Sequence, residues 1–162
     1  MVLIHRGHYK GTNISEGRGT TLPFQLFGAP FLNPYKLLKP FMAICDSSVT
    51  LRPVYFEPLA DKWQGRRCGG FHIHVLNGKG FRPFRFGLSI LRLLLELFPE
   101  EFEWIPPPYE YEFRRLPIDV ILGSERVREA LESGKSLEEI EGLWTDELNE
   151  YLERRDSCRL YT

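Results

Sequence analysis

FHIHVLNGKGFRPFRFGLSILRLLLELF, the stretch from Phe71 to Phe98, contains the two patterns that decide the fold. Residues 71–75 alternate between apolar and polar side chains, which predicts a half-buried β-strand with both histidines on one face. An Asn-Gly-Lys-Gly turn follows at 77–80. From Arg82 the apolar side chains recur at helical spacing until Pro99 ends the pattern, which predicts an amphipathic helix over 82–98.

A second strand and several helices are predicted on either side of this unit. Val49–Glu57 is rich in β-branched and aromatic residues, and Pro53 within it indicates an edge strand or a bulge. Helices are predicted at 34–45, 117–132 and 136–155, the first with a kink or break at Pro40. Ser136, with Glu139 three residues later, is typical of a capping box at the start of the last helix.

Little regular structure is predicted for the remaining segments. We expect a strand leading into a loop over residues 1–9, at most one helical turn over 24–27, and an ordered aromatic-rich connection over 100–117. The fold predicted from these patterns is a single α+β domain over residues 1–162. It has a small mixed sheet packed against several helices, and its C-terminus is helical.

The composition narrows the class of protein. With 162 residues, of which 43% are apolar and 27% charged, the chain is typical of a globular domain that buries a core. A net charge of -1 argues against a nucleic-acid partner, because such proteins usually carry a basic domain or stripe. No stretch reaches the roughly 20 apolar residues of a membrane span, and no signal peptide is recognisable. We therefore predict no membrane partner and, for the chain as written, a cytoplasmic location.

The metal-binding residue types form no recognisable motif. Cys45, Cys68 and Cys158 are far apart and lack a C-x-x-C pair, so free packed thiols are expected. His72 and His74 project from one strand face and supply two metal ligands, but a third would have to come from His5, His8 or Glu57. This leaves a metal-dependent hydrolase as a weaker alternative. Our prediction is that the chain has no metal site and no cofactor.

The polar chemistry of the chain is concentrated in the loop from Thr12 to Thr21. Two glycines, Gly17 and Gly19, flank Arg18 and allow the backbone to aim its guanidinium. Hydroxyl, amide and charged side chains of this kind suit sugar hydroxyls or a carboxylate, which an arginine binds with two parallel hydrogen bonds. The candidate substrate-binding residues here are Asn13, Ser15, Glu16, Arg18, Thr20 and Thr21. A purely structural loop, held by a Glu16–Arg18 pair and side-chain turns, is an equal alternative.

Tyr55 is a candidate outside this loop. It lies on the predicted strand 49–57, where its ring could stack on a sugar, and core packing is the alternative.

The same loop carries a family resemblance. The run Thr12–Thr21, followed by Pro-Phe-Gln-Leu-Phe-Gly-Ala-Pro at 23–30, resembles the start of the C-terminal domain of the exo-β-N-acetylmuramidase family. That family was formerly described as a domain of unknown function. Further matches follow in the same order: Arg52–Phe56, Cys68–Gly70 before His74 and Val75, Phe81–Pro83, Phe98 with Pro99, and Phe102–Trp104. The resemblance spans residues 10–162.

The resemblance implies a function and a partner. Family members resemble one another in having an N-terminal Rossmann-like domain that carries the proposed catalytic acid, and we expect this half to be absent here. The chain is then the C-terminal substrate-cleft module of an exo-β-N-acetylmuramidase-like glycoside hydrolase acting on peptidoglycan-derived sugars. The alternative is a non-catalytic binding or interaction module. Whether the isolated chain is an enzyme stays open, and Glu16 is its one candidate catalytic residue in the loop. A missing partner domain would expose an apolar patch, so we also expect a homodimer.

Overall fold

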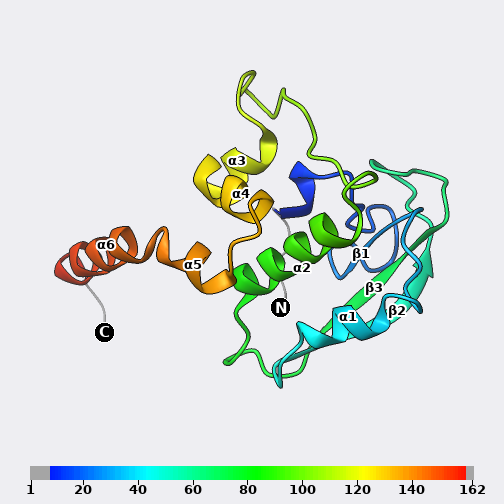
Figure 1. Cartoon of the computed structure of the whole chain (residues 1–162), viewed down its shortest axis with the longest axis horizontal. Coiled ribbons are helices and arrows are strands. Elements are labelled where there is room, and N and C mark those ends of the chain that lie inside the picture. The colour runs from blue at the N-terminus through cyan, green and yellow to red at the C-terminus, as the bar shows by residue number, and fades with distance from the viewer. Residues whose placement is uncertain (1–7, 160–162) are drawn as a thin grey trace.

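A computed structural model describes residues 8–159 of the chain, and Figure 1 shows the order of its elements. The sheet strands are β1 (Leu26–Ala29), β2 (Val49–Phe56) and β3 (Cys68–Val75). The helices are the short 3₁₀ segment η2 (His8–Gly11), α1 (Leu38–Ala43), α2 (Pro83–Leu97), α3 (Pro117–Leu122), α4 (Glu125–Glu132), α5 (Leu137–Gly142) and α6 (Thr145–Ser157). Most of the strand expected over residues 1–9 lies outside the described residues, and none of the described helices is long and apolar enough to cross a membrane.

The three strands form one sheet in the order β1-β3-β2. Both pairings are antiparallel, with Thr50 opposite His74 and Phe27 opposite Phe71. The α+β class is confirmed, but the sheet is not mixed as expected. No helical crossover lies between β2 and β3, and a parallel pair would require one.

The prediction of a helical turn over 24–27 is wrong, because the chain enters β1 at Leu26. All four residues of β1 are buried. A short buried run of this kind is equally compatible with a strand and with a helical turn, so the sequence pattern alone does not distinguish them. Pairing with β3 decides between the two. A Cβ added to Gly70 would lie 1.9 Å from the carbonyl oxygen of Phe27, so the β1 backbone approaches β3 closely only because residue 70 is glycine.

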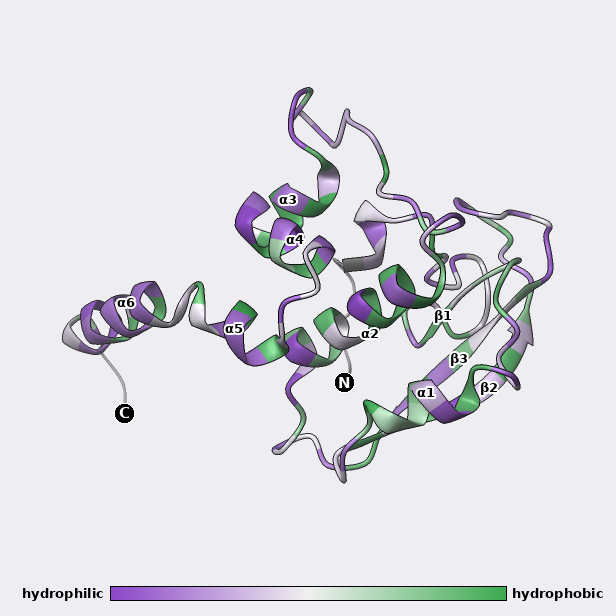
Figure 2. Cartoon of the chain, in the orientation of Figure 1, coloured by the Kyte–Doolittle hydropathy of each residue, from purple (hydrophilic) through white to green (hydrophobic). Residues whose placement is uncertain are grey.

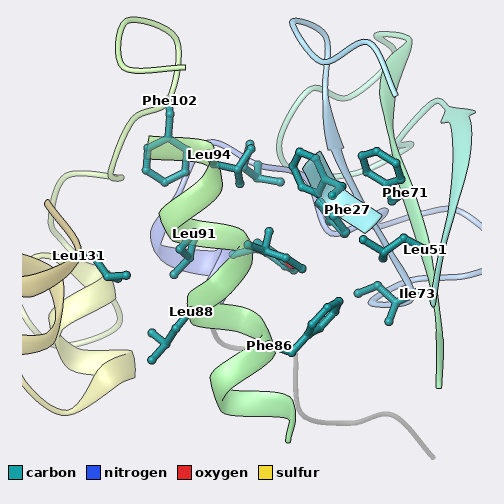
Figure 3. Packing of buried hydrophobic residues seen from close by; sticks show 14 of the residues in the cluster. Phe27, Leu51, Phe71, Ile73, Phe86, Leu88, Leu91, Leu94, Phe102 and Leu131 are labelled. Atoms are coloured by element: carbon teal, nitrogen blue, oxygen red, sulfur yellow. The ribbon is translucent and has the colours of Figure 1, made fainter. Parts of the chain in front are cut away.

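Helix α2 is the centre of the core. Its buried residues include Phe86, Leu88, Leu91 and Leu94. Figure 3 shows α2 between the sheet, which presents Phe27, Leu51, Phe71 and Ile73, and the helical side, which presents Leu131. The predicted strand–helix unit therefore organises both halves of the domain.

The other helices are shorter than predicted. The helix expected over 34–45 begins only at Leu38, and Pro40 lies in its first turn, where a proline costs no helical hydrogen bond. The segment 117–132 divides at Gly123, whose φ of 79° ends α3. The segment 136–155 divides between α5 and α6, and the Ser136–Glu139 capping box is present at the start of α5.

Candidate functional site

The loop from Thr12 to Thr21 is fixed at two points to the rest of the domain. Thr12 forms an isolated β-bridge with Trp104, and Ser15 forms another with Gly28 of β1. Thr12 is fully buried and Ser15 is 1% exposed. The Ser15 hydroxyl accepts a hydrogen bond from the Gly17 N–H at 3.2 Å, so its polar side chain braces the loop and does not face solvent.

The glycines of the loop adopt the left-handed backbone that their positions require. Gly17 has φ of 69° and Gly19 has φ of 77°. The Thr20 hydroxyl donates to the Gly17 carbonyl at 2.6 Å and accepts from the Leu22 N–H at 3.2 Å, so it closes the turn. The half-buried Thr20 therefore uses its hydroxyl within the turn, whereas Thr21 makes no such hydrogen bond among the described residues and is exposed.

Glu16 lies at the centre of a buried charge cluster. The residue is 1% exposed. One carboxylate oxygen accepts a hydrogen bond from Arg18 Nε at 3.3 Å. The other oxygen lies 2.9 Å from Lys62 Nζ, an ion-pair distance, although the angles there miss those of a hydrogen bond. Both oxygens are therefore occupied by cations, so neither is open to a glycosidic oxygen, and this arrangement favours an anchoring role for Glu16.

Lys62, which the sequence did not identify, joins the loop to the connection between β2 and β3. Its Nζ also donates to the carbonyl oxygens of Tyr9 and Ile14, at 2.5 and 2.8 Å. Asp61 and Trp63 flank it with φ of 65° and 59°, backbone conformations that L-residues adopt at a cost of order 1 kcal/mol. The strained turn therefore carries the Lys62 ammonium into the domain beneath the loop.

Burial and charge in this cluster shift the ionisation of two neighbours of Glu16. Desolvation lowers the pKa of Lys62, while Glu16 acts in the opposite direction by stabilising the ammonium. Burial, and secondarily the Glu16 charge, raise the pKa of Tyr9 well above its usual value. The cluster is therefore a desolvated one in which the Glu16 carboxylate compensates the Lys62 charge.

Arg18 connects this cluster to an open pocket. Its Nε also lies 3.1 Å from Asp61 Oδ2, and its guanidinium lies over the Phe24 ring, 5.1 Å from the centroid. Among residues 8–159, its two terminal nitrogens make no hydrogen bond. These nitrogens can form the two parallel bonds that an arginine makes with a carboxylate.

The pocket beside Arg18, which we call the Arg18 pocket, has a volume of about 370 Å³ and is lined by Lys10, Arg18, Asp61, Lys62, Ile105, Pro108, Tyr109 and Glu110. Three of these residues are cations and two are carboxylates. The connection 100–117 supplies a half-buried aromatic ring, Tyr109. A pocket of this size and character suits a small polar ligand that carries a negative charge.

Asn13 belongs to a different hollow on the domain. Its side-chain amide donates to the backbone carbonyl of Glu101 at 2.7 Å, and its backbone carbonyl accepts from the indole N–H of Trp63 at 2.5 Å. It lines a cavity of about 430 Å³ together with Phe31, Trp63, Arg66 and others. The structure thus separates Asn13 from Arg18, although both lie in the same predicted site.

Tyr55 lies on β2 and lines neither of these two cavities. The residue is 42% exposed, and its ring lies beneath the Arg67 guanidinium, with 4.1 Å between the ring centroid and the guanidinium carbon. Tyr35 lies beside it, at 6.1 Å between ring centroids. The structure therefore does not bring Tyr55 together with the Arg18 pocket.

The two strand histidines do lie side by side, with ring centroids 3.9 Å apart. Arg52 Nη2 lies 3.1 Å from Nδ1 of His72, and Gln25 Oε1 lies 3.3 Å from its Nε2. Since arginine only donates, Nδ1 accepts and Nε2–H donates, so both ring nitrogens are used. Within residues 8–159, no group of three or more His, Cys, Asp or Glu side chains could hold a metal. The side chains of His5 and His8 lie outside the described part of the chain.

Solved structures define the class of domain to which this fold belongs. Two DUF1343 family proteins from Bacteroides fragilis NCTC 9343 share it. The first aligns with a TM-score of 0.76 and 20% sequence identity, covering 99% of this chain and 40% of the other. The second aligns with a TM-score of 0.63 and 24% identity, covering 95% of this chain and 38% of the other. The fold is thus that of one part of larger DUF1343 proteins.

The chain belongs to the family described as exo-beta-N-acetylmuramidase NamZ, C-terminal, whose model matches residues 5–161. It is also similar to the peptidoglycan beta-N-acetylmuramidase NamZ of Bacillus subtilis (strain 168), with 33% identity over 155 residues. That alignment covers 96% of this chain and 36% of the relative. The resemblance inferred from the polar loop is therefore confirmed, and the chain spans about a third of the relative's length.

Proposed function

We propose that this domain binds the N-acetylmuramic acid end of a peptidoglycan fragment in the Arg18 pocket and contributes that surface to an exo-acting N-acetylmuramidase. One observation carries the proposal: Arg18, whose two terminal nitrogens make no hydrogen bond to described residues, lines a pocket that is also lined by Lys10 and Lys62. N-acetylmuramic acid differs from N-acetylglucosamine by a lactyl ether whose carboxylate is ionised at neutral pH. A forked guanidinium with the Lys10 ammonium in the same pocket lining is suited to that carboxylate, whereas the Lys62 ammonium is already paired with Glu16.

In this proposal the cleavage step belongs to another part of the enzyme. Glycoside hydrolysis generally uses two carboxyl groups flanking the scissile bond. Glu16 is buried between Arg18 and Lys62, and Asp61 is paired with Arg18, so two of the nearby carboxylates are engaged. The family resemblance supports a Rossmann-like N-terminal domain as the source of the acid. The isolated chain is then a binding module without turnover of its own.

The test is a calorimetric titration of the chain with two disaccharides, one ending in N-acetylmuramic acid and one in N-acetylglucosamine. We expect the first to bind at least tenfold more tightly, because losing a charge-assisted contact costs about 1.5–3 kcal/mol. Arg18→Gln should remove the preference. The control is Arg82→Gln, because Arg82 lines a different pocket, and this variant should keep the preference for N-acetylmuramic acid.

Three results would contradict the proposal. Equal affinities for the two sugars in the parent chain would remove the role of the lactyl carboxylate. Release of free N-acetylmuramic acid during the titration would place a catalytic group in this chain. Absence of any binding would leave the alternative, an interaction module that uses the loop only as a brace.

A further inference from the structure

Helix α6 is the least supported element of the domain. It has 13 residues, Thr145–Ser157, and none of them is buried. Figure 1 shows it projecting beyond the rest of the chain, at the end farthest from the sheet. An isolated helix of this length is marginal in water, because most helical stability in proteins comes from packing one face against a neighbour. A face of α6 is therefore available for a partner.

One face of α6 is apolar. Leu148, Tyr151 and Leu152 lie at i, i+3 and i+4, the spacing of a single helical stripe. Leu148 is 45% exposed and Tyr151 is 56% exposed, while the helix around them is largely hydrophilic (Figure 2). The stripe continues into a hollow of about 650 Å³ whose lining includes Val127, Trp144 and Leu148. The stripe and the hollow share Leu148 and form one surface, largely apolar but with Arg126 and Glu147 in its lining, which we call the α6 face.

The charges beside this stripe are arranged for pairing with a copy of themselves. Glu147 and Arg154 are seven residues apart, so they lie on the same flank of the helix with opposite charge. When two such helices pack antiparallel about a two-fold axis, Glu147 of each copy faces Arg154 of the other.

The present partners of these two residues do not prevent such an exchange. Arg126 lies 3.8 Å from Glu147, and Glu150 lies 3.7 Å from Arg154. All four side chains are more than half exposed, and exposed pairs of this kind contribute about 0–1 kcal/mol.

We propose that the α6 face is a homodimer interface, in which α6 packs antiparallel on α6 of a second copy. Leu148, Tyr151 and Leu152 form the seam, and two symmetric Glu147–Arg154 pairs set the direction. The self-complementary charge pattern favours a second copy over an unrelated apolar surface. This interface uses no residue that lines the Arg18 pocket, so it stands independently of sugar binding.

The experiment is sedimentation velocity on the full chain over a range of concentrations. We expect a mass of about twice 19.0 kDa at high concentration. Glu147→Arg and Arg154→Glu should each raise the dissociation constant about tenfold, because each substitution alters two contacts across the axis. The double variant exchanges the two charges and should recover the parent dissociation constant. Since α6 buries no residue, circular dichroism should show an intact fold in all three variants.

Glu153→Arg is the matched control, since helical spacing places residue 153 away from the stripe, and it should leave the dissociation constant unchanged. A monomer at every concentration would overturn the proposal and leave the α6 face to a different partner. A dimer that ignores both single substitutions would place the interface elsewhere. A double variant as weak as the single ones would exclude the antiparallel arrangement.

Discussion

At the scale of single residues, Glu16 decides what the polar loop can do. Its carboxylate lies between Arg18 and Lys62, with both oxygens occupied and almost no exposure. Burying three charges together is costly unless each has a partner, and here the carboxylate serves two cations at once. This explains how a loop with such a polar composition can be buried against the domain while Arg18 lines the pocket.

Glu16→Gln should therefore destabilise the domain by about 3 kcal/mol, because it leaves the Lys62 ammonium buried without a compensating charge. Urea unfolding followed by circular dichroism measures the effect. Glu110→Gln, on an exposed residue of the same pocket, should change stability by less than about 0.5 kcal/mol.

Adding Lys62→Met to Glu16→Gln removes the unpaired charge as well. The double variant should then lose less stability than the two single losses added together. Additive losses would mean that the two side chains do not act as a unit.

At the scale of elements, the close contact between β1 and β3 connects the loop to the core. Ser15 bridges to Gly28, and Gly28 lies opposite Gly70 in the sheet. The position of the loop therefore depends on how closely these two strands approach. Apolar periodicity did not predict β1 because a four-residue buried run has no period that separates a strand from a helical turn.

Gly70→Ala should destabilise the domain by about 1–3 kcal/mol or more, since the added methyl group would lie 1.9 Å from a backbone carbonyl oxygen. The same measurement on Gly78→Ala, where nothing lies within 4 Å of the added group, should show almost no change. Equal effects at the two positions would show that the approach of β1 to β3 is not under steric constraint.

At the scale of the whole molecule, the ionisation of His72 makes stability depend on pH. This residue lies on β3 and contacts Arg52 of β2 and Gln25, which directly precedes β1. Burial lowers the pKa of His72, and the neighbouring His74 and Arg52 act in the same direction. The folded chain therefore keeps His72 neutral at pH values where the unfolded chain, with an ordinary pKa of about 6.5, binds a proton. The stability contributed by neutral His72 is fully present above the unfolded pKa of about 6.5. It falls as the pH is lowered from there towards the pKa of His72 in the folded chain.

We expect the free energy of unfolding to decrease between pH 7.5 and pH 5.5, and His72→Gln to show a smaller decrease. Urea titrations at a series of pH values measure both slopes. Equal slopes in the parent and the variant would assign the pH dependence to other groups.

The sequence by itself determined the class of fold and the family. The alternation at 71–75 and the helical spacing at 82–98 are local patterns, so the strand and the central helix were predictable without a structure. The polar loop was recognisable for the same reason, because its ten residues are contiguous in the chain. The Glu16–Arg18 pair, which was predicted for the purely structural alternative of that loop, is present in the structure.

Only the tertiary structure decided which of these residues share a pocket. Lys62 lies 46 residues after Glu16 in the sequence and Tyr109 lies farther still, and no local pattern connects them to the loop. Asn13 and Tyr55 were predicted as substrate-binding residues along with Arg18, yet neither lines the Arg18 pocket. The physical reason is that side-chain proximity across distant segments is set by packing and by buried charge compensation, and neither is a property of neighbouring residues in the chain.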